Sequence, residues 1–174
     1  MNKQLSGYLA LLFLSLSLLC SACSNEDKDE GPSGIWDIYP LNVLIIVQDK
    51  NENDLLDSDF KHNLLESGIK ATHKGTTYEL KIDELSKEPS TRYYMPTFYG
   101  LKLYSFDKKN YLSIGEFDGA KEYKQEKIII DWNDGTKNTI TFNYKLKWKN
   151  NKPYAEKEFF LDGVKVKDPI EIIK

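Results

Sequence analysis

Oxygen-bearing side chains gather in one short segment, with a spacing typical of calcium loops. Asp49, Asn51 and Asn53 lie at alternate positions, and Asp57 follows them. Calcium takes six to eight oxygen ligands, and loops with Asp or Asn at positions 1, 3 and 5 supply several of them. The usual glycine at position 6 is replaced by Asp54. Because Asn and Asp also dominate ordinary turns, the segment is either a calcium site or a plain loop.

Aromatic side chains offer a second kind of chemistry, because a ring presents both an apolar face and a polar edge to a sugar or a peptide. Tyr93, Tyr94, Phe98 and Tyr99 lie close together around Pro96. The proline interrupts the regular strand pattern, so we expect these rings to be exposed. The sequence predicts a glycan or protein contact at this cluster.

Motifs for catalysis are weak. The two histidines, His62 and His73, are eleven residues apart and fit neither a metalloprotease motif nor a triad arrangement. We expect both to be surface residues. The sequence therefore predicts a protein that is not an enzyme and that needs no cofactor other than the calcium considered above.

The balance of charge restricts the class of partner, and the cysteine content restricts how the fold is stabilised. Of the 24 basic and 27 acidic residues, two basic and four acidic residues precede residue 31, which leaves 22 and 23 in the remainder. This near balance gives no electrostatic basis for binding nucleic acid. No cysteine follows Cys23, so we expect the fold to depend on its apolar core rather than on disulfides.

Short alternating segments between turn signals predict an all-β fold, an antiparallel Ig-like β-sandwich. The strongest segment, Leu41 to Gln48, is almost continuously apolar, and we expect burial on both of its faces. Residues 69–82 predict a hairpin around Lys74-Gly75. Lys127 to Trp132 predicts a buried strand with Trp132 in the core.

Residues 58–66 are the exception to the strand pattern. Ser58 is a suitable helix cap, and Phe60, Leu64 and Leu65 would share one helical face. This spacing predicts one short helix in an otherwise β domain.

Residues 139–161 predict a second hairpin with a defined register. Thr139 to Lys149 alternates strictly, and Asn150-Asn151 is a two-residue turn. Counting back from the turn places Phe142 opposite Phe159 and Lys145 opposite Glu156. Opposite charges then face each other on the solvent side, a gain of about 0.2–1 kcal/mol for each pair.

The N-terminal residues have the layout of a secretory signal. Lys3 precedes an uncharged segment, Tyr8 to Leu19, which is shorter than the about 20 residues that span a membrane. Ser21-Ala22 and Cys23 follow. This arrangement resembles a bacterial lipoprotein signal, in which the cysteine is acylated and becomes the mature N-terminus. Cys20 is the competing acceptor, and a plain cleaved signal is the other alternative.

The acidic tail after Cys23, residues 24–30, is similar to the export signal of surface-exposed lipoproteins in Bacteroidetes. Residues 1–22 are then the signal peptide, residues 23–34 an acidic flexible linker, and residues 35–174 a single β-sandwich domain. The stretch Asp131 to Thr136 is similar to the D-W-x-D-G-T signature of polycystic-kidney-disease-type Ig-like domains, where it has a structural role.

The chain as a whole resembles the small, functionally uncharacterised surface lipoproteins of Bacteroidetes with an Ig-like β-sandwich domain. The resemblance implies a non-catalytic accessory role at the cell surface, with a membrane partner through the lipid anchor and a glycan or protein partner through the domain. The expected location is the outer membrane, with the domain facing the cell exterior. The alternative is a periplasm-facing structural subunit that docks on a larger envelope complex.

Overall fold

The computed structural model describes residues 36–82 and 96–174, which form ten strands and no helix. The all-β prediction is confirmed. The strands are β1 Leu41–Gln48, β2 Lys70–His73, β3 Thr76–Lys81, β4 Gly100–Phe106, β5 Lys109–Phe117, β6 Tyr123–Asp131, β7 Lys137–Lys149, β8 Lys152–Leu161, β9 Val164–Val166 and β10 Ile170–Ile173.

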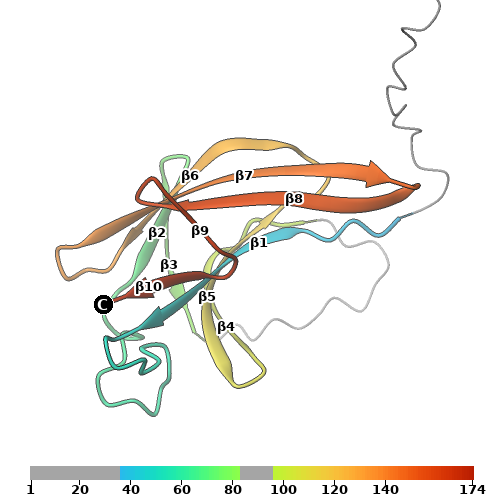
Figure 1. Cartoon of the computed structure of the whole chain (residues 1–174). Coiled ribbons are helices and arrows are strands. Elements are labelled where there is room, and N and C mark those ends of the chain that lie inside the picture. The colour runs from blue at the N-terminus through green and yellow to red at the C-terminus, as the bar shows by residue number, and fades with distance from the viewer. Residues whose placement is uncertain (1–35, 83–95) are drawn as a thin grey trace, which may run out of the picture.

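All ten strands belong to one sheet with the order β10-β1-β5-β4-β3-β2-β6-β7-β8-β9. The link between its two halves is short, since parallel β3 and β4 pair only at Leu80–Leu101 and Lys81–Lys102. The sheet curls until the half around β1 and β5 faces the half around β6 and β7 (Figure 1). Inward-facing residues of both halves form one apolar core.

No helical segment within these two ranges has the length and apolar character needed to cross a bilayer.

A tight turn fixes the register of the β7–β8 hairpin. Asn150 and Asn151 both have positive φ, 51° and 58°, as a two-residue hairpin turn requires. The predicted register follows, with Phe142 opposite Phe159 and Lys145 opposite Glu156. That prediction is confirmed.

The predicted helix at 58–66 is wrong, because the segment is a series of turns. The side chains of Asp57 and Asn63 accept hydrogen bonds from the amides of Asp59 and Leu65, at 2.9 and 3.1 Å. Asp and Asn side chains that bind nearby amides compete with helical hydrogen bonding. Leu65 still reaches the core, as the apolar pattern indicated.

Burial of β1 differs from the prediction on one side of the strand. Val43, Ile45 and Val47 are buried in the core, but Leu44 and Ile46 on the outer face are only half-buried. The described residues provide only partial cover for this outer face. The apolar run of β1 therefore marks a sheet face that is partly open to solvent.

Close packing around Gly119 holds the segment before β1 in place. The buried Tyr144 hydroxyl donates a hydrogen bond to the Gly119 carbonyl oxygen at 2.7 Å. A Cβ atom on Gly119 would overlap the carbonyl oxygen of Tyr39. The absence of a side chain here thus lets residues 38–40 lie against the loop between β5 and β6.

We expect Gly119→Ala to lower the free energy of unfolding by about 1–3 kcal/mol, since added volume at a packed site forces a backbone shift. Urea denaturation measures the change. Lys121→Ala in the same loop, at an exposed position, is the control and should stay within about 0.5 kcal/mol of the parent. Equal stability of the two variants would contradict the close approach.

Candidate functional site

Exposed aromatic rings line the outer face of the β4–β5 hairpin. Tyr104 and Phe106 point outward because Leu101 and Leu103, on the alternate positions of β4, pack in the core. The Tyr104 and Phe106 rings are nearly parallel, with an interplanar angle of 5° and centroids 6.5 Å apart. Their side chains are 37% and 65% exposed, respectively. The hairpin therefore presents two nearly parallel aromatic rings to solvent.

A third ring extends this surface across the hairpin. Tyr111 of β5 lies opposite Tyr104 in the register, with ring centroids 6.2 Å apart. Phe106 lies opposite Lys109, next to the turn. We call Tyr104, Phe106 and Tyr111 the aromatic face.

Tyr99 lies on the same outer side of the sheet, over β1 and β5. Its hydroxyl donates to Asn42 Oδ1 at 3.0 Å and shares a hydrogen bond with Ser113 Oγ at 2.7 Å. Burial raises the pKa of Tyr99, although the hydrogen bond with Ser113 acts in the other direction. The Lys102 ammonium group lies 3.9 Å from the centre of the Tyr99 ring. These contacts hold Tyr99 in place on the same side of the sheet as the aromatic face.

The predicted aromatic cluster is thus divided by the fold. Tyr93 and Tyr94 lie outside the described residues. Phe98 turns inward and packs against Tyr78 and Phe117, with ring centroids 5.1 and 5.0 Å away. Ligand contact at these residues stays a prediction, and Tyr99 is the member that the structure places beside the aromatic face.

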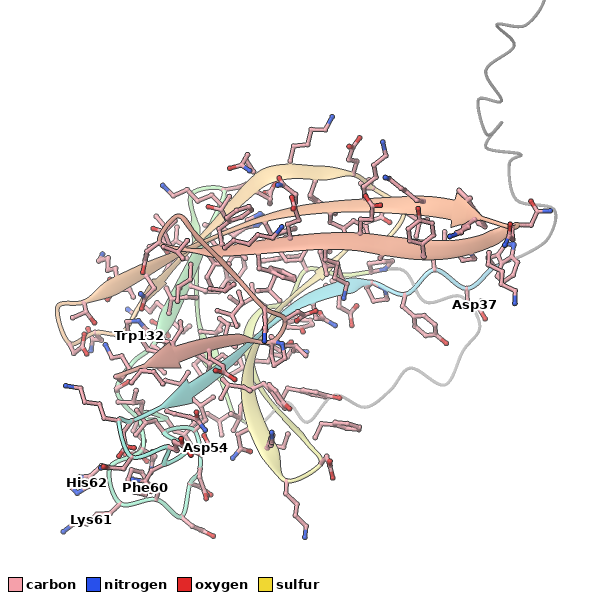
Figure 2. All side chains as sticks on the ribbon, in the orientation of Figure 1. Asp37, Asp54, Phe60, Lys61, His62 and Trp132 are labelled. Carbon is pink, nitrogen blue, oxygen red and sulfur yellow. The ribbon has the colours of Figure 1, made fainter. Side chains whose placement is uncertain are left out.

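The predicted calcium loop follows β1 and is closed by its own hydrogen bonds. Asp49 Oδ1 accepts from the amides of Asn51 and Asn53 at 2.8 and 2.9 Å, and Asp49 Oδ2 accepts from Asn53 Nδ2 at 2.8 Å. The hydrogen bonds from Asn53 are the main reason that the pKa of Asp49 is lowered. Asp57 caps the next turn (Figure 2 shows this loop around Asp54, Phe60 and His62).

In residues 36–82 and 96–174, no group of three or more His, Cys, Asp or Glu side chains is arranged to hold a metal ion. Calcium at Asp49, Asn51, Asn53 and Asp57 stays a prediction. The loop has a structural contact with the hairpin, since Asn110 Nδ2 donates to Asp54 Oδ2 at 2.9 Å. This bond braces the β4–β5 hairpin from its inner side.

His73 is not the surface residue that the sequence indicated, whereas His62 is exposed as expected. The His73 ring lies against Phe98 and Phe117, with centroids 4.8 and 5.3 Å away. Its Nε2 atom is 2.6 Å from Glu126 Oε1, and the Lys74 ammonium is 3.0 Å from the same oxygen. The result is a compact, half-buried ion-pair cluster.

A β-bulge in β6 places Glu126 in this cluster. The register with β7 shifts between Tyr123 and Glu126, and Gln125 has a φ of 50°. Bulges redirect side chains and are frequent near functional sites. Burial raises the pKa of Glu126, but the hydrogen bonds from His73 and Lys74 outweigh it, so the pKa is below its ordinary value.

A depression of about 360 Å³ lies on the outside of β2 and β6, next to this cluster, and is lined by Lys74, Gly75, Gln125, Glu126 and Lys127 among others. His73 does not line it. The histidine ring is thus held among aromatic rings rather than presented to this opening.

Glu116 is a further perturbed carboxyl group. Burial raises its pKa, partly offset by the backbone hydrogen bond with Thr97. Its Oε2 atom is buried and has no hydrogen-bond partner in the described part of the chain. A perturbed carboxyl group is a marker of functional sites.

Sequence reasoning missed Phe106 as a site residue and did not recognise β4 as a strand. The signal was present, since Leu101 and Leu103 alternate with Lys102, Tyr104 and Phe106. Positive φ at Asp107 and Lys108, 48° and 62°, closes the hairpin without glycine. Positive φ is uncommon for residues other than glycine. The sequence of this turn therefore gave no clear indication of a hairpin.

Comparison with known proteins gives no relative: no family model matches the chain, and no curated protein or solved structure matches it either.

The ion-pair cluster of His73, Lys74 and Glu126 gives the free energy of unfolding a testable pH dependence. Because its pKa is lower in the folded state than in the unfolded chain, ionised Glu126 stabilises the fold above about pH 4.3. This contribution is lost as pH falls through the folded-state pKa. We expect Glu126→Gln to lower the free energy of unfolding at pH 7, with a difference from the parent that shrinks toward pH 3.

Urea denaturation between about pH 3 and pH 8 gives the comparison. Glu122→Gln removes a carboxylate that is paired with Lys124 at an exposed position, and it should show little effect at any pH. A difference for Glu126→Gln that is constant across the range would contradict the assignment.

Proposed function

We propose that this protein is a non-catalytic, lipid-anchored accessory protein of the outer surface of the outer membrane, and that it binds a glycan on the aromatic face. The observation that carries the proposal is the pair of exposed, nearly parallel rings of Tyr104 and Phe106.

Ring chemistry supports a sugar as the ligand. An aromatic ring offers a flat apolar surface against which the C–H face of a sugar ring can stack. Lys109 lies opposite Phe106 in the register, where its ammonium group can donate hydrogen bonds to sugar hydroxyls. A row of rings along one hairpin suits an extended chain of sugars better than a small ligand that needs an enclosed pocket.

A binding role without catalysis is supported by the contacts within the ion-pair cluster of His73, Lys74 and Glu126. The imidazole of His73 packs between aromatic rings and does not line the depression beside it, and the Glu126 carboxylate that does line it is paired with His73 and Lys74. General acid–base catalysis needs such a group within hydrogen-bond reach of a substrate.

The anchor rests on the sequence, since Cys23 lies outside the described residues. An uncharged segment, small residues and then Cys23 form the pattern. Acyl chains are favoured in a bilayer by about 0.8 kcal/mol for each buried methylene group, and stable anchoring takes two or more signals. The acidic residues after Cys23 support export to the cell exterior.

The Ig-like relation is part of the proposal. It is supported by two sheet halves packed on one core with turns between short strands. The two halves are connected by the pairing of β3 with β4. In this respect the domain would differ from a sandwich of two separate sheets.

A periplasm-facing subunit that docks on an envelope complex is the second candidate. It is favoured by Leu44 and Ile46, which extend the aromatic face with aliphatic surface on β1. It is also favoured by the edge of β8. On that edge β9 pairs only with Phe159, Phe160 and Leu161, so residues 152–158 have no partner strand there in the described part of the chain. Apolar surface and unpaired strand edges are typical of protein contacts.

We expect the protein to bind at least one polysaccharide in a panel from host and plant sources, detected as a rise in melting temperature. Tyr104→Ala and Phe106→Ala should each weaken binding about tenfold, which corresponds to about 1.4 kcal/mol. Tyr154→Ala is the matched control, because it removes an exposed tyrosine from a different hairpin, and its affinity should equal that of the parent.

Binding that is equally strong in the Tyr104→Ala and Phe106→Ala variants would exclude the aromatic face as the site. If no polysaccharide in the panel raises the melting temperature, the docking function replaces the glycan function, and cross-linking on intact cells identifies the partner.

Replacement of Cys23 tests the anchor separately. Cys23→Ala should release the protein from membranes into the soluble fraction and abolish incorporation of labelled fatty acid. Cys20→Ala is the control and should leave both unchanged. Continued labelling of Cys23→Ala would move the anchor to Cys20 or refute acylation.

A further inference from the structure

The described chain begins beside the end of the β7–β8 hairpin. Trp36 packs edge-on against Trp148, with ring centroids 6.2 Å apart and an interplanar angle of 67°. Figure 1 shows the start of the coloured chain next to the tip of this hairpin, and Figure 2 shows Asp37 at the same end of the molecule. Any anchor upstream of Trp36 therefore acts on the molecule at this tip.

Aromatic and basic side chains are concentrated at the tip. Trp36, Tyr39 and Tyr154 are 38%, 82% and 40% exposed. Lys149 and Lys152 lie opposite each other next to the turn. We define the tip surface by its six residues, Trp36, Tyr39, Trp148, Lys149, Lys152 and Tyr154.

The two lysines of the tip have no acidic partner in the part of the chain that the structure describes. Lys149 and Lys152 are exposed and make no ion pair within residues 36–82 and 96–174. Glu156 and Asp37 are acidic residues of the same region. Glu156 is 2.8 Å from the Lys147 ammonium, and Asp37 is adjacent to Trp36. Among the described residues, the tip therefore carries a local excess of positive charge next to its aromatic rings.

A groove of about 220 Å³ separates residues 37–41 from the hairpin. Leu146 and Ala155 line it from the hairpin, and the exposed Tyr39 and Tyr154 also line it. Apolar surface is thus accessible between the aromatic rings of the tip.

We propose that the tip surface lies on an anionic lipid surface, the membrane to which Cys23 is anchored. The proposal rests on the lipid anchor of the proposed function. Trp and Tyr favour the membrane–water interface, because their rings have an apolar body and a polar edge. Lysines at the same level face the phosphates of lipid headgroups.

The length of the chain before Trp36 agrees with this contact. Twelve residues lie between Cys23 and Trp36, and the thirteen steps from one Cα atom to the next span at most about 45 Å. Once Cys23 is in the membrane, contact by the tip is intramolecular, so a weak surface becomes effective at a high local concentration.

The proposed orientation leaves the aromatic face available. The β4–β5 hairpin leaves the sheet in a different direction from the β7–β8 tip (Figure 1). A protein that rests on its tip would thus hold Tyr104 and Phe106 away from the contact with the membrane.

Tryptophan quenching tests the orientation, because the chain has three tryptophans. Trp132 is buried in the core and lies far from the tip in Figure 2. The acylated mature protein, which begins at Cys23, is reconstituted into vesicles of phosphatidylethanolamine and phosphatidylglycerol, 3:1, with and without brominated acyl chains. We expect the brominated lipid to reduce the emission of the parent protein by about one-third or more.

The Trp36→Phe/Trp148→Phe variant keeps two aromatic rings at the tip and emits from Trp132 alone. Its emission should be the same in both kinds of vesicle. Lys149→Gln/Lys152→Gln should show less quenching than the parent. Thermal unfolding of each variant checks that the fold is retained.

Three outcomes would overturn the proposal. The first is equal emission of the parent in both kinds of vesicle, which would leave the tip free for a protein or glycan partner. The second is quenching of Trp132 in the double tryptophan variant. The third is unchanged quenching in the lysine variant. Failure of the anchor is separate, since protein without acyl chains would not float with the vesicles.

Discussion

The packing of Phe117 is the interaction on which the rest of the fold depends. The hydrogen-bonded connection between the two halves of the sheet consists of two residue pairs between β3 and β4. Phe117, at the end of β5, contacts Phe142 and Tyr123 of the other half, with ring centroids 5.0 and 5.5 Å away. It also contacts Phe98 and His73. Side-chain packing rather than backbone pairing therefore holds the curled sheet together.

A single core leaves the outer sheet surface to serve other roles. The inward-facing residues of β1, β4 and β5 are buried in the core. The residues at the alternate positions therefore face solvent or a partner. On β4 and β5 those positions carry Tyr104, Phe106 and Tyr111. The hydrogen bond between Asn110 and Asp54 braces the same hairpin from behind. The fold thus supports the aromatic face from behind without covering it.

Local patterns were sufficient for several elements. The bounds of β1 and the register of the β7–β8 hairpin follow from alternation and a two-residue Asn-Asn turn. The expectation for residues 58–66 failed because a helical spacing of apolar residues says nothing about Asp and Asn side chains that capture nearby amides. The aromatic face was hidden for a similar reason, since β4 ends at a turn without glycine.

By itself the sequence determined the class of secondary structure, the two faces of β7 and the register of the β7–β8 hairpin. Only the tertiary structure decided which distant strands pair, as in β1 with β5 and β10. It also brought His73 to Glu126, 53 residues away, and Trp36 to Trp148. The physical reason is that a period of two specifies which side chains face inward, whereas the partner of each strand is selected by how the side chains of the whole core fill one volume.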